Sequence, residues 1–333
     1  MSRTAVFGAG SWGTAFALVL ADAGHDVTIW GRRPDLCAAI NDTHENPDYL
    51  PEITLPRAIR ATSDPAEAAQ DAELVVLAVP SQRLRENLQD WAGVLPENAI
   101  LLSLMKGVEL GTLKRMSQVI AELTGAGPER IAVLSGPNLA REIASREPAA
   151  SVVACADESV AARLREMLHG PQFRPYSSVD VLGCELGGAY KNVIALAVGM
   201  AVGLGFGDNT TASVITRGLA ETARLAEKLG ADPLTLMGLA GLGDLVATCS
   251  SPLSRNRTFG EKLGRGMTTE EITASTRQVA EGVKSCGSLL ALAQHNQIYA
   301  PVVEAVNAVV EGVLSTEEMM QSFVSRETKH ERD

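Results

Sequence analysis

The sequence predicts an α/β protein that begins with a doubly wound, mostly parallel sheet and ends in an all-helical segment. Three observations lead to this fold class. Short apolar runs alternate with helix-like stretches up to about residue 180, and a glycine-rich turn joins the first run to the first helix. After about residue 180 the pattern is helical only. A chain of 333 residues is also long for one domain, so we expect domains at residues 1–180 and 181–333.

Seven apolar runs in the first half are expected to be strands. The run LVVLAV at residues 74–79 has no polar interruption, as expected of a strand that helices cover on both faces. Since parallel strands end at one edge of a sheet, the polar and glycine-containing loops behind them should line one crevice. The expected strands are residues 4–7, 27–30, 74–79, 100–104, 131–134, 151–154 and 173–176.

Helical spacing of apolar residues dominates the second half. Two helices are expected before residue 180, at 11–23 and 158–169. Beyond it we expect one helix through Lys191 and others at 210–229, 255–263, 283–295 and 302–313.

The segment GAGSWG joins the first strand to the first helix. In such a turn Gly8 permits a tight bend, Gly10 lets the backbone approach a pyrophosphate, and Gly13 lets the helix pack closely on the strand. The free N–H groups of the helix N-terminus then face the anion. The order strand, motif, helix, strand predicts a Rossmann-type dinucleotide site; the alternative is a glycine-rich turn without a ligand.

Two arginines follow the second strand, at the place where a dinucleotide's adenosine ribose would lie. An NAD site usually has a carboxylate there, but Arg32 and Arg33 come first and Asp35 is the first acid. Guanidinium groups suit the 2′-phosphate of NADP. The sequence therefore favours NADPH over NADH without excluding either, and the alternative is a pair of solvated surface arginines.

Composition narrows the class of protein. A net charge of −11 argues against general binding to nucleic acid or to anionic membranes. The five cysteines are widely spaced and form no CxxC motif, which indicates reduced thiols and implies no metal site. They are Cys37, Cys155, Cys184, Cys249 and Cys286.

Neither end of the chain nor its most apolar stretch indicates a membrane. The N-terminus passes into the first strand without a signal-like segment. Residues 193–207 are apolar but too short and too rich in glycine to span a bilayer, so a buried helix is expected. We expect a soluble, cytoplasmic protein without membrane insertion, either a monomer or a homodimer.

Two motifs in the second half suggest chemistry. ELGGAYKNVIA places Lys191 inside an apolar helix, where an ammonium needs a partner, a lowered pKa or a function. In SRN, Ser254 is a plausible N-cap, so backbone N–H groups, Arg255 and Asn256 would surround an anion. The alternatives are a lysine that reaches solvent along the helix surface and a capped surface helix with an incidental arginine.

The motifs together resemble the bacterial glycerol-3-phosphate dehydrogenases that use NAD(P). The resemblance spans nearly the whole chain and implies a Rossmann domain followed by a helical domain. It also implies interconversion of sn-glycerol 3-phosphate and dihydroxyacetone phosphate, a small phosphorylated substrate, in support of phospholipid synthesis. The matching motifs, in order, are GAGSWGTA, VPS, MKG, SGPN, ELGGAYKNVIA, GFGDN, ITRGLAE, GLAGLGDL and SRNRTFG.

The resemblance also implies roles for individual residues. Lys191 would carry the proton in catalysis, and Lys106 would contact both nucleotide and substrate. The other substrate-binding residues would be Gly136, Asn138, Asp244, Ser254, Arg255 and Asn256. The nucleotide would contact Ser11, Trp12, Arg32, Arg33, Ala140, Arg255, Val279 and Glu281. Asn138 departs from the Thr or Ser that many members carry, which leaves its role open.

Two other functions remain open at this point. A nucleotide-sensing module could use the same scaffold, because fold does not fix function. A dehydrogenase of a β-hydroxy acid would need a carboxylate site, whereas SRN suits a phosphate. Retention of Lys191, Asp244 and Arg255 disfavours the sensor, which needs no proton carrier.

Overall fold

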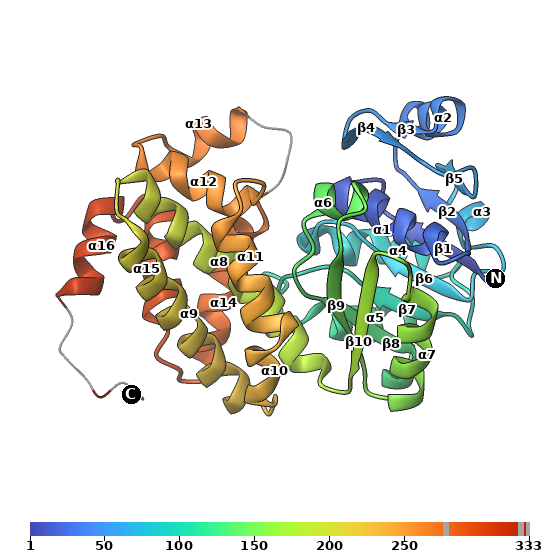
Figure 1. The fold of residues 1–333 in the computed structure, drawn as a ribbon. Coiled ribbons are helices and arrows are strands. Elements are labelled where there is room, and N and C mark those ends of the chain that lie inside the picture. Colours follow the sequence, from blue (N-terminus) through green and yellow to red (C-terminus); the bar gives the residue numbers. More distant parts are fainter. Residues whose placement is uncertain (276–279, 326–329, 331–333) are drawn as a thin grey trace.

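The computed structural model describes residues 1–275, 280–325 and 330. Figure 1 shows a lobe built around a sheet and, beside it, a lobe built of helices. The last strand ends at Ser178, and each later element of the described chain is a helix. The predicted fold class is confirmed.

The sheet has eight strands in the order β10-β9-β8-β7-β6-β1-β2-β5. All neighbours are parallel except β8 and β9, which are antiparallel. All seven predicted strands are present, and β5 and the small hairpin of β3 and β4 add to them. The strands are β1 (Arg3–Phe7), β2 (Asp26–Trp30), β3 (Glu45–Asn46), β4 (Leu50–Thr54), β5 (Ile59–Thr62), β6 (Leu74–Leu77), β7 (Ile100–Ser103), β8 (Ile131–Ser135), β9 (Ala149–Cys155) and β10 (Phe173–Ser178).

Helices cover both faces of the sheet, as a doubly wound fold requires. Val6 and Val76 pack against the helices on one face of the sheet. Their neighbours along the strands, Phe7 and Val75, pack against the helices on the other face. The two faces therefore follow the period of two along each strand. On one face lie α1 (Ser11–Asp22), α2 (Pro34–Thr43), α6 (Ala140–Ala144) and α7 (Glu158–Leu168); on the other lie α3 (Pro65–Ala69), α4 (Leu84–Trp91) and α5 (Met116–Thr124).

The helical lobe (Figure 1) surrounds one central helix, α8 (Val181–Gly203), which contains Lys191. Each helix predicted in this half is present, with ends shifted by up to three residues where a bound had been predicted. The others are α9 (Asp208–Lys228), α10 (Pro233–Met237), α11 (Asp244–Ser250), α12 (Arg255–Gly264), α13 (Thr269–Ala274), α14 (Glu281–His295), α15 (Pro301–Val310) and α16 (Thr316–Val324).

Helix α8 corrects one step of the sequence reasoning. Residues 193–203 of the apolar stretch are the end of a 23-residue helix, the one described helix that is long and apolar enough to cross a membrane, and residues 204–207 follow that helix. However, 83% of its most apolar 18-residue window is buried within the protein. Burial, rather than insufficient length, identifies it as a core helix.

Close packing of α8 and α12 fixes the position of the SRN segment. A Cβ at Gly199 would collide with the carbonyl oxygen of Arg257, and one at Gly260 would collide with that of Leu196. Only glycine permits this approach of the two backbones. The N-terminus of α12 is thereby held beside α8, where Asn256 contacts Asn192, the residue that follows Lys191.

Candidate active site

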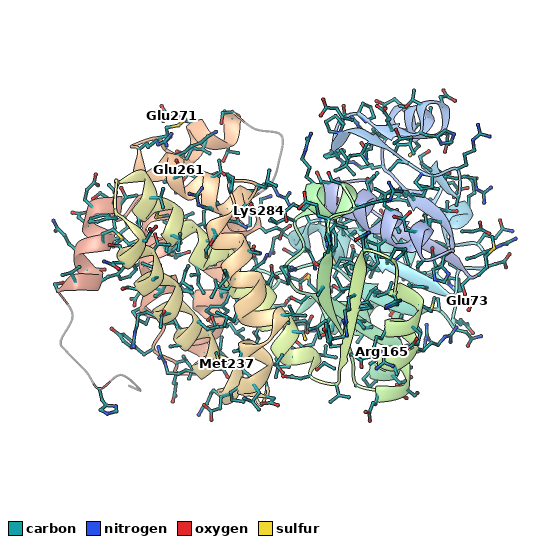
Figure 2. All side chains as sticks on the ribbon, in the orientation of Figure 1. Glu73, Arg165, Met237, Glu261, Glu271 and Lys284 are labelled. Carbon is teal, nitrogen blue, oxygen red and sulfur yellow. The ribbon has the colours of Figure 1, made fainter. Side chains whose placement is uncertain are left out.

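The candidate site lies where strands of the sheet end against α8, α11 and α12. Strands β1, β6, β7 and β8 run in the same direction and end in the turns that begin at Gly8, Ala78, Leu104 and Gly136. In an open parallel sheet this edge is the usual ligand site. In Figure 2, Lys284, one turn into α14, lies at the boundary between the two lobes, whereas Glu73 and Arg165 lie on the outer side of the sheet lobe.

The geometry of the glycine turn fits a dinucleotide. A Cβ at Gly8, whose φ is +135°, would collide with the carbonyl of Ala78, and a Cβ at Gly13 would collide with that of Gly8. A Cβ at Gly10 would meet nothing within 4 Å, so the space in front of it is open. No side chain caps the N-terminus of α1, which leaves backbone N–H groups for an anion.

Residues on both sides of Gly10 are held in place. The Ser11 hydroxyl donates a hydrogen bond to the carbonyl of Tyr49 (2.8 Å). The buried amide of Asn46 donates to the carbonyl of Ala9 (2.9 Å) and to the Thr14 hydroxyl (2.8 Å). The hairpin of β3 and β4 thus holds the glycine turn from outside the sheet.

Trp12 offers a further polar atom near the turn. Its indole Nε1 is buried and has no hydrogen-bond partner among the described residues. Buried polar groups are normally paired. An unpaired donor beside an open, uncapped helix N-terminus is consistent with a ligand that accepts from it.

The two arginines behind β2 differ in their surroundings. Arg32 is exposed, and it forms no ion pair with a described residue. Arg33 forms an ion pair with Asp48, and its second acidic neighbour, Asp35, lies 4.0 Å away. The hydrogen bond from Arg33 to Asp48 raises the pKa of the guanidinium.

Where the two lobes meet, two lysines share one carboxylate. Lys191 Nζ donates to Asp244 Oδ1 (2.6 Å) and to Thr248 Oγ1 (2.7 Å). Lys106 Nζ donates to Asp244 Oδ2 (2.5 Å) and to the carbonyl of Gly136 (3.0 Å). The Asp244 side chain is 0% exposed, so one buried anion is bracketed by two cations.

Electrostatics make this cluster suited to proton transfer. Burial lowers the pKa of Lys106 to about 8; the negative charge of Asp244 opposes that shift and the ammonium of Lys191 adds to it. The three groups carry one positive charge in excess. A partly buried site with spare positive charge favours an anion or a developing oxyanion.

A single π-helical turn, Leu239–Gly243, directly precedes Asp244. Single turns of this kind are frequent at functional sites. From there α11 directs Asp244 and Thr248, one turn apart, toward α8. Leu242 in the π-helical turn and Val246 in α11 are exposed.

The loop after β8 lies beside the lysines. Gly136 has a φ of +144° and presents its carbonyl to Lys106. Asn138 accepts a hydrogen bond from the Ser151 hydroxyl, while its own Nδ2 is buried without a partner among the described residues. Ala140 begins α6, which packs on α1.

The SRN segment begins α12, with Ser254 as the N-cap that the sequence predicts. Ser254 caps α12 by accepting from the N–H of Arg257 (3.2 Å). Arg255 is exposed to solvent, yet surrounding protein lowers the pKa of its guanidinium, with Glu281 opposing the shift.

Asn256 has partners on both ends of its amide. Its Nδ2 donates to Asn192 Oδ1 (2.8 Å), and its Oδ1 accepts from the N–H of Gly282 (2.9 Å). Asn192 in turn lies 3.5 Å from the carbonyl of Lys106. Asn256 therefore ties α12 to α8 and α14.

Glu281 links the lobes. It accepts hydrogen bonds from the Ser81 hydroxyl (2.6 Å) and the Ser81 N–H (3.3 Å), and burial raises its pKa. Val279 lies outside the described residues. Three further residues take part in the contacts described above but were not singled out as site residues from the sequence: Thr248, Ser81 and Asn192. Ser81 lies in the VPS motif and Asn192 in YKN, whereas no local pattern marked Thr248.

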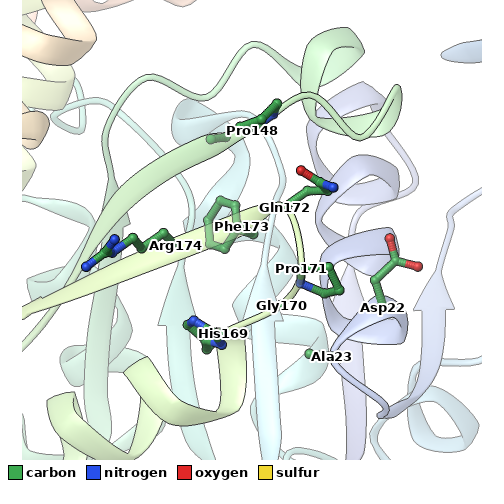
Figure 3. Close-up of a pocket in the computed structure, with 10 residues that line it drawn as sticks. Asp22, Ala23, Pro148, His169, Gly170, Pro171, Gln172, Phe173 and Arg174 are labelled. Carbon is green, nitrogen blue, oxygen red and sulfur yellow. The ribbon is translucent and has the colours of Figure 1, made fainter.

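A separate groove of about 540 Å³ lies beside the C-terminal end of α1, the end opposite the glycine turn. Figure 3 shows it lined by Asp22, His169, Gln172, Phe173 and Arg174. None of the predicted site residues lines it.

Comparison with known proteins identifies the family. Residues 3–161 match the NAD-dependent glycerol-3-phosphate dehydrogenase N-terminus, and residues 180–321 match its C-terminus. The "glycerol-3-phosphate dehydrogenase [NAD(P)+]" of Streptomyces coelicolor is 62% identical over 99% of this chain and 98% of its own length. That of Thermobifida fusca is 60% identical over 100% and 99%.

A solved structure agrees. The crystal structure of glycerol-3-phosphate dehydrogenase from Coxiella burnetii is 36% identical, covers 98% of this chain and 99% of its own, and superimposes with a TM-score of 0.93. Both halves of the fold are thus shared along nearly the whole length. This chain belongs to the NAD-dependent glycerol-3-phosphate dehydrogenase family.

Proposed function

We propose that this protein interconverts sn-glycerol 3-phosphate and dihydroxyacetone phosphate with NADPH or NADH and supplies glycerol 3-phosphate for phospholipid synthesis. The names of the relatives support the reaction. One observation carries it at the level of chemistry: Lys191 and Lys106 converge on the buried Asp244 at the mouth of a dinucleotide-type crevice. A nucleotide sensor would gain nothing from two lysines held around one carboxylate.

The residues present fit a dinucleotide. Gly10 leaves room for a pyrophosphate, the N-terminus of α1 supplies N–H groups, and Trp12 Nε1 is an unpaired donor among the described residues. We assign the nucleotide to Gly8, Gly10, Ser11, Trp12, Gly13, Arg32, Arg33, Lys106, Ala140, Arg255, Val279 and Glu281.

Lys191 is proposed as the proton carrier. A reduced nicotinamide bound beside it would supply the hydride for C2 of dihydroxyacetone phosphate. Negative charge then develops on the C2 oxygen, where the Lys191 ammonium stabilises it and donates a proton to form the alcohol. Asp244 and Thr248 fix the direction of that ammonium. In the reverse direction the neutral amine accepts the proton.

The substrate phosphate is assigned to the N-terminus of α12. Ser254 shapes that terminus, and Arg255 extends into the open crevice. A phosphate there would accept from backbone N–H groups and from the guanidinium. Lys106, Gly136, Asn138, Asp244 and Asn256 would surround the rest of the substrate.

The test is an absorbance assay at the reduced-nicotinamide band with dihydroxyacetone phosphate, once with NADPH and once with NADH. We expect turnover with both and a lower KM for NADPH, because Arg32 and Arg33 follow β2. A β-keto acid serves as the control substrate and should give no rate. Absence of a rate with dihydroxyacetone phosphate and either nucleotide would overturn the proposal.

Three further proposals concern the protein as a whole. Residues 1–180 and 181–333 are proposed as separate domains, and limited proteolysis should cut first near that boundary. The chain is proposed to act in the cytoplasm, which fractionation of cells tests. Light scattering distinguishes the monomer from the homodimer, between which the sequence does not choose.

A further inference from the structure

The position of Asp48 has a bearing on which nucleotide is bound. In the sequence, no carboxylate follows β2 until Asp35, which left an NADH ribose without its usual acceptor. The structure brings Asp48, from the turn between β3 and β4, onto Arg33. A carboxylate therefore does lie beside Arg33, directly after β2, and it comes 13 residues further along the chain than sequence order suggested.

Asp48 is held there by its neighbours. On one side, Asn46 is fully buried and bonded to Ala9 and Thr14. On the other, the carbonyl of Tyr49 accepts from Ser11, and its N–H lies 3.3 Å from Asn46 Oδ1. The segment that carries Asp48 is thus fixed to the same turn that would receive the pyrophosphate.

The Arg33–Asp48 pair presents opposite chemistries to the two nucleotides. The 2′-phosphate of NADPH would bind the guanidinium, but Arg33 is already paired with Asp48, whose negative charge would repel the phosphate. The 2′-hydroxyl of NADH is a hydrogen-bond donor that a carboxylate accepts. Asp35 does not do the same, because it lies 4.0 Å from Arg33 and its side chain is 75% exposed against 37% for Asp48.

We propose that Asp48 is a specificity-determining residue: by pairing with Arg33 it weakens binding of NADPH and so reduces the preference for NADPH over NADH that the two arginines create. This inference rests on the proposed dinucleotide site and adds the residue that balances the two arginines. It accounts for use of either nucleotide by a chain whose local sequence favours NADPH.

Isothermal titration calorimetry of the full chain with NADPH and with NADH tests this directly, without substrate. Asp48→Asn should lower the Kd for NADPH about three- to tenfold and leave that for NADH unchanged or up to threefold higher. The matched control, Asp35→Asn, removes the same charge from the other acidic neighbour and should change the ratio of the two Kd values less than twofold. In an Arg33→Ala background, Asp48→Asn should lower the Kd for NADPH by a smaller factor.

Two results would overturn the inference. One is that Asp48→Asn changes the ratio of the two Kd values no more than Asp35→Asn does. The other is that Asp48→Asn changes the Kd for NADPH and the Kd for NADH equally. Asp48→Glu, which restores the charge, should return the ratio toward that of the parent. Failure of the proposed reaction is a separate outcome. If dihydroxyacetone phosphate is not reduced but the Kd ratio shifts as expected, the dehydrogenase activity is wrong and the role of Asp48 stands.

Discussion

Replacing Lys191 with alanine should abolish most turnover while leaving the fold intact. The structure explains why the two effects separate. Removing one member of a buried ion pair normally costs about 3–5 kcal/mol, because the partner is left charged and unpaired. Here Asp244 keeps Lys106 at 2.5 Å and Thr248 at 3.3 Å, so the carboxylate is not orphaned. We therefore expect a loss of stability below about 3 kcal/mol.

The expected loss of turnover follows from the proton that Lys191 supplies. A positioned general acid contributes about 10² to 10⁴ in rate, which corresponds to about 2.7–5.4 kcal/mol of activation free energy. Lys191→Met is the matched variant, because it keeps the aliphatic stem within α8 and removes only the ammonium. Both variants should lose turnover to the same extent, and Lys191→Met should lose less stability.

Initial rates with dihydroxyacetone phosphate and NADPH measure the effect on chemistry, and thermal unfolding together with NADPH titration measures the effect on folding and nucleotide binding. Turnover near that of the parent in a folded Lys191→Met protein would refute the assignment. The proton would then come from another group, and Lys106 is the nearest candidate because it shares Asp244.

Three other changes have defined outcomes. Arg255→Ala should raise the KM for dihydroxyacetone phosphate and lower kcat, since binding energy from a remote phosphate helps to orient the carbonyl; unchanged kinetics at saturating nucleotide would contradict this. Asp244→Ala should destabilise the protein by about 3–5 kcal/mol in urea unfolding, because two buried ammonium groups lose their counter-charge, and Lys191→Met on top should restore part of that loss. The pKa of Lys106, lowered to about 8 from 10.5, means that the unfolded chain holds more protons between those values. Stability relative to a Lys106→Met variant should therefore rise with pH through that window, by up to about 3 kcal/mol in urea titrations, and a flat difference would show that the pKa is unperturbed.

What the sequence could predict was local. The roles of Gly8, Gly10 and Gly13 follow from steric rules that act within one turn, and each is matched by a collision or an open space in the structure. Ser254 was predicted as an N-cap for the same reason. Lys191 stood out because a lysine among apolar residues at helical spacing needs a partner.

What the sequence could not predict depends on contacts between distant segments. The hairpin of β3 and β4 has little apolar alternation, and its place is fixed by hydrogen bonds from Asn46 to residues 37 and 32 positions earlier. Asp48 was missed with it. Thr248 meets Lys191 across 57 residues, and only the π-helical turn before α11 brings it there. Such placements depend on tertiary packing, which local propensity does not predict.

The site has an excess of positive charge, whereas the chain as a whole is negatively charged. The protein carries −11, yet Lys106, Lys191 and Arg255 outnumber Asp244 and Glu281 around the site. A small anion must therefore pass a repulsive exterior, and it is held only where low dielectric strengthens the local cations. Because Asp244 neutralises one of its two lysines, the excess positive charge is left for the substrate: enough to stabilise one developing oxyanion, while Asp244 prevents the two buried ammonium groups from repelling each other apart.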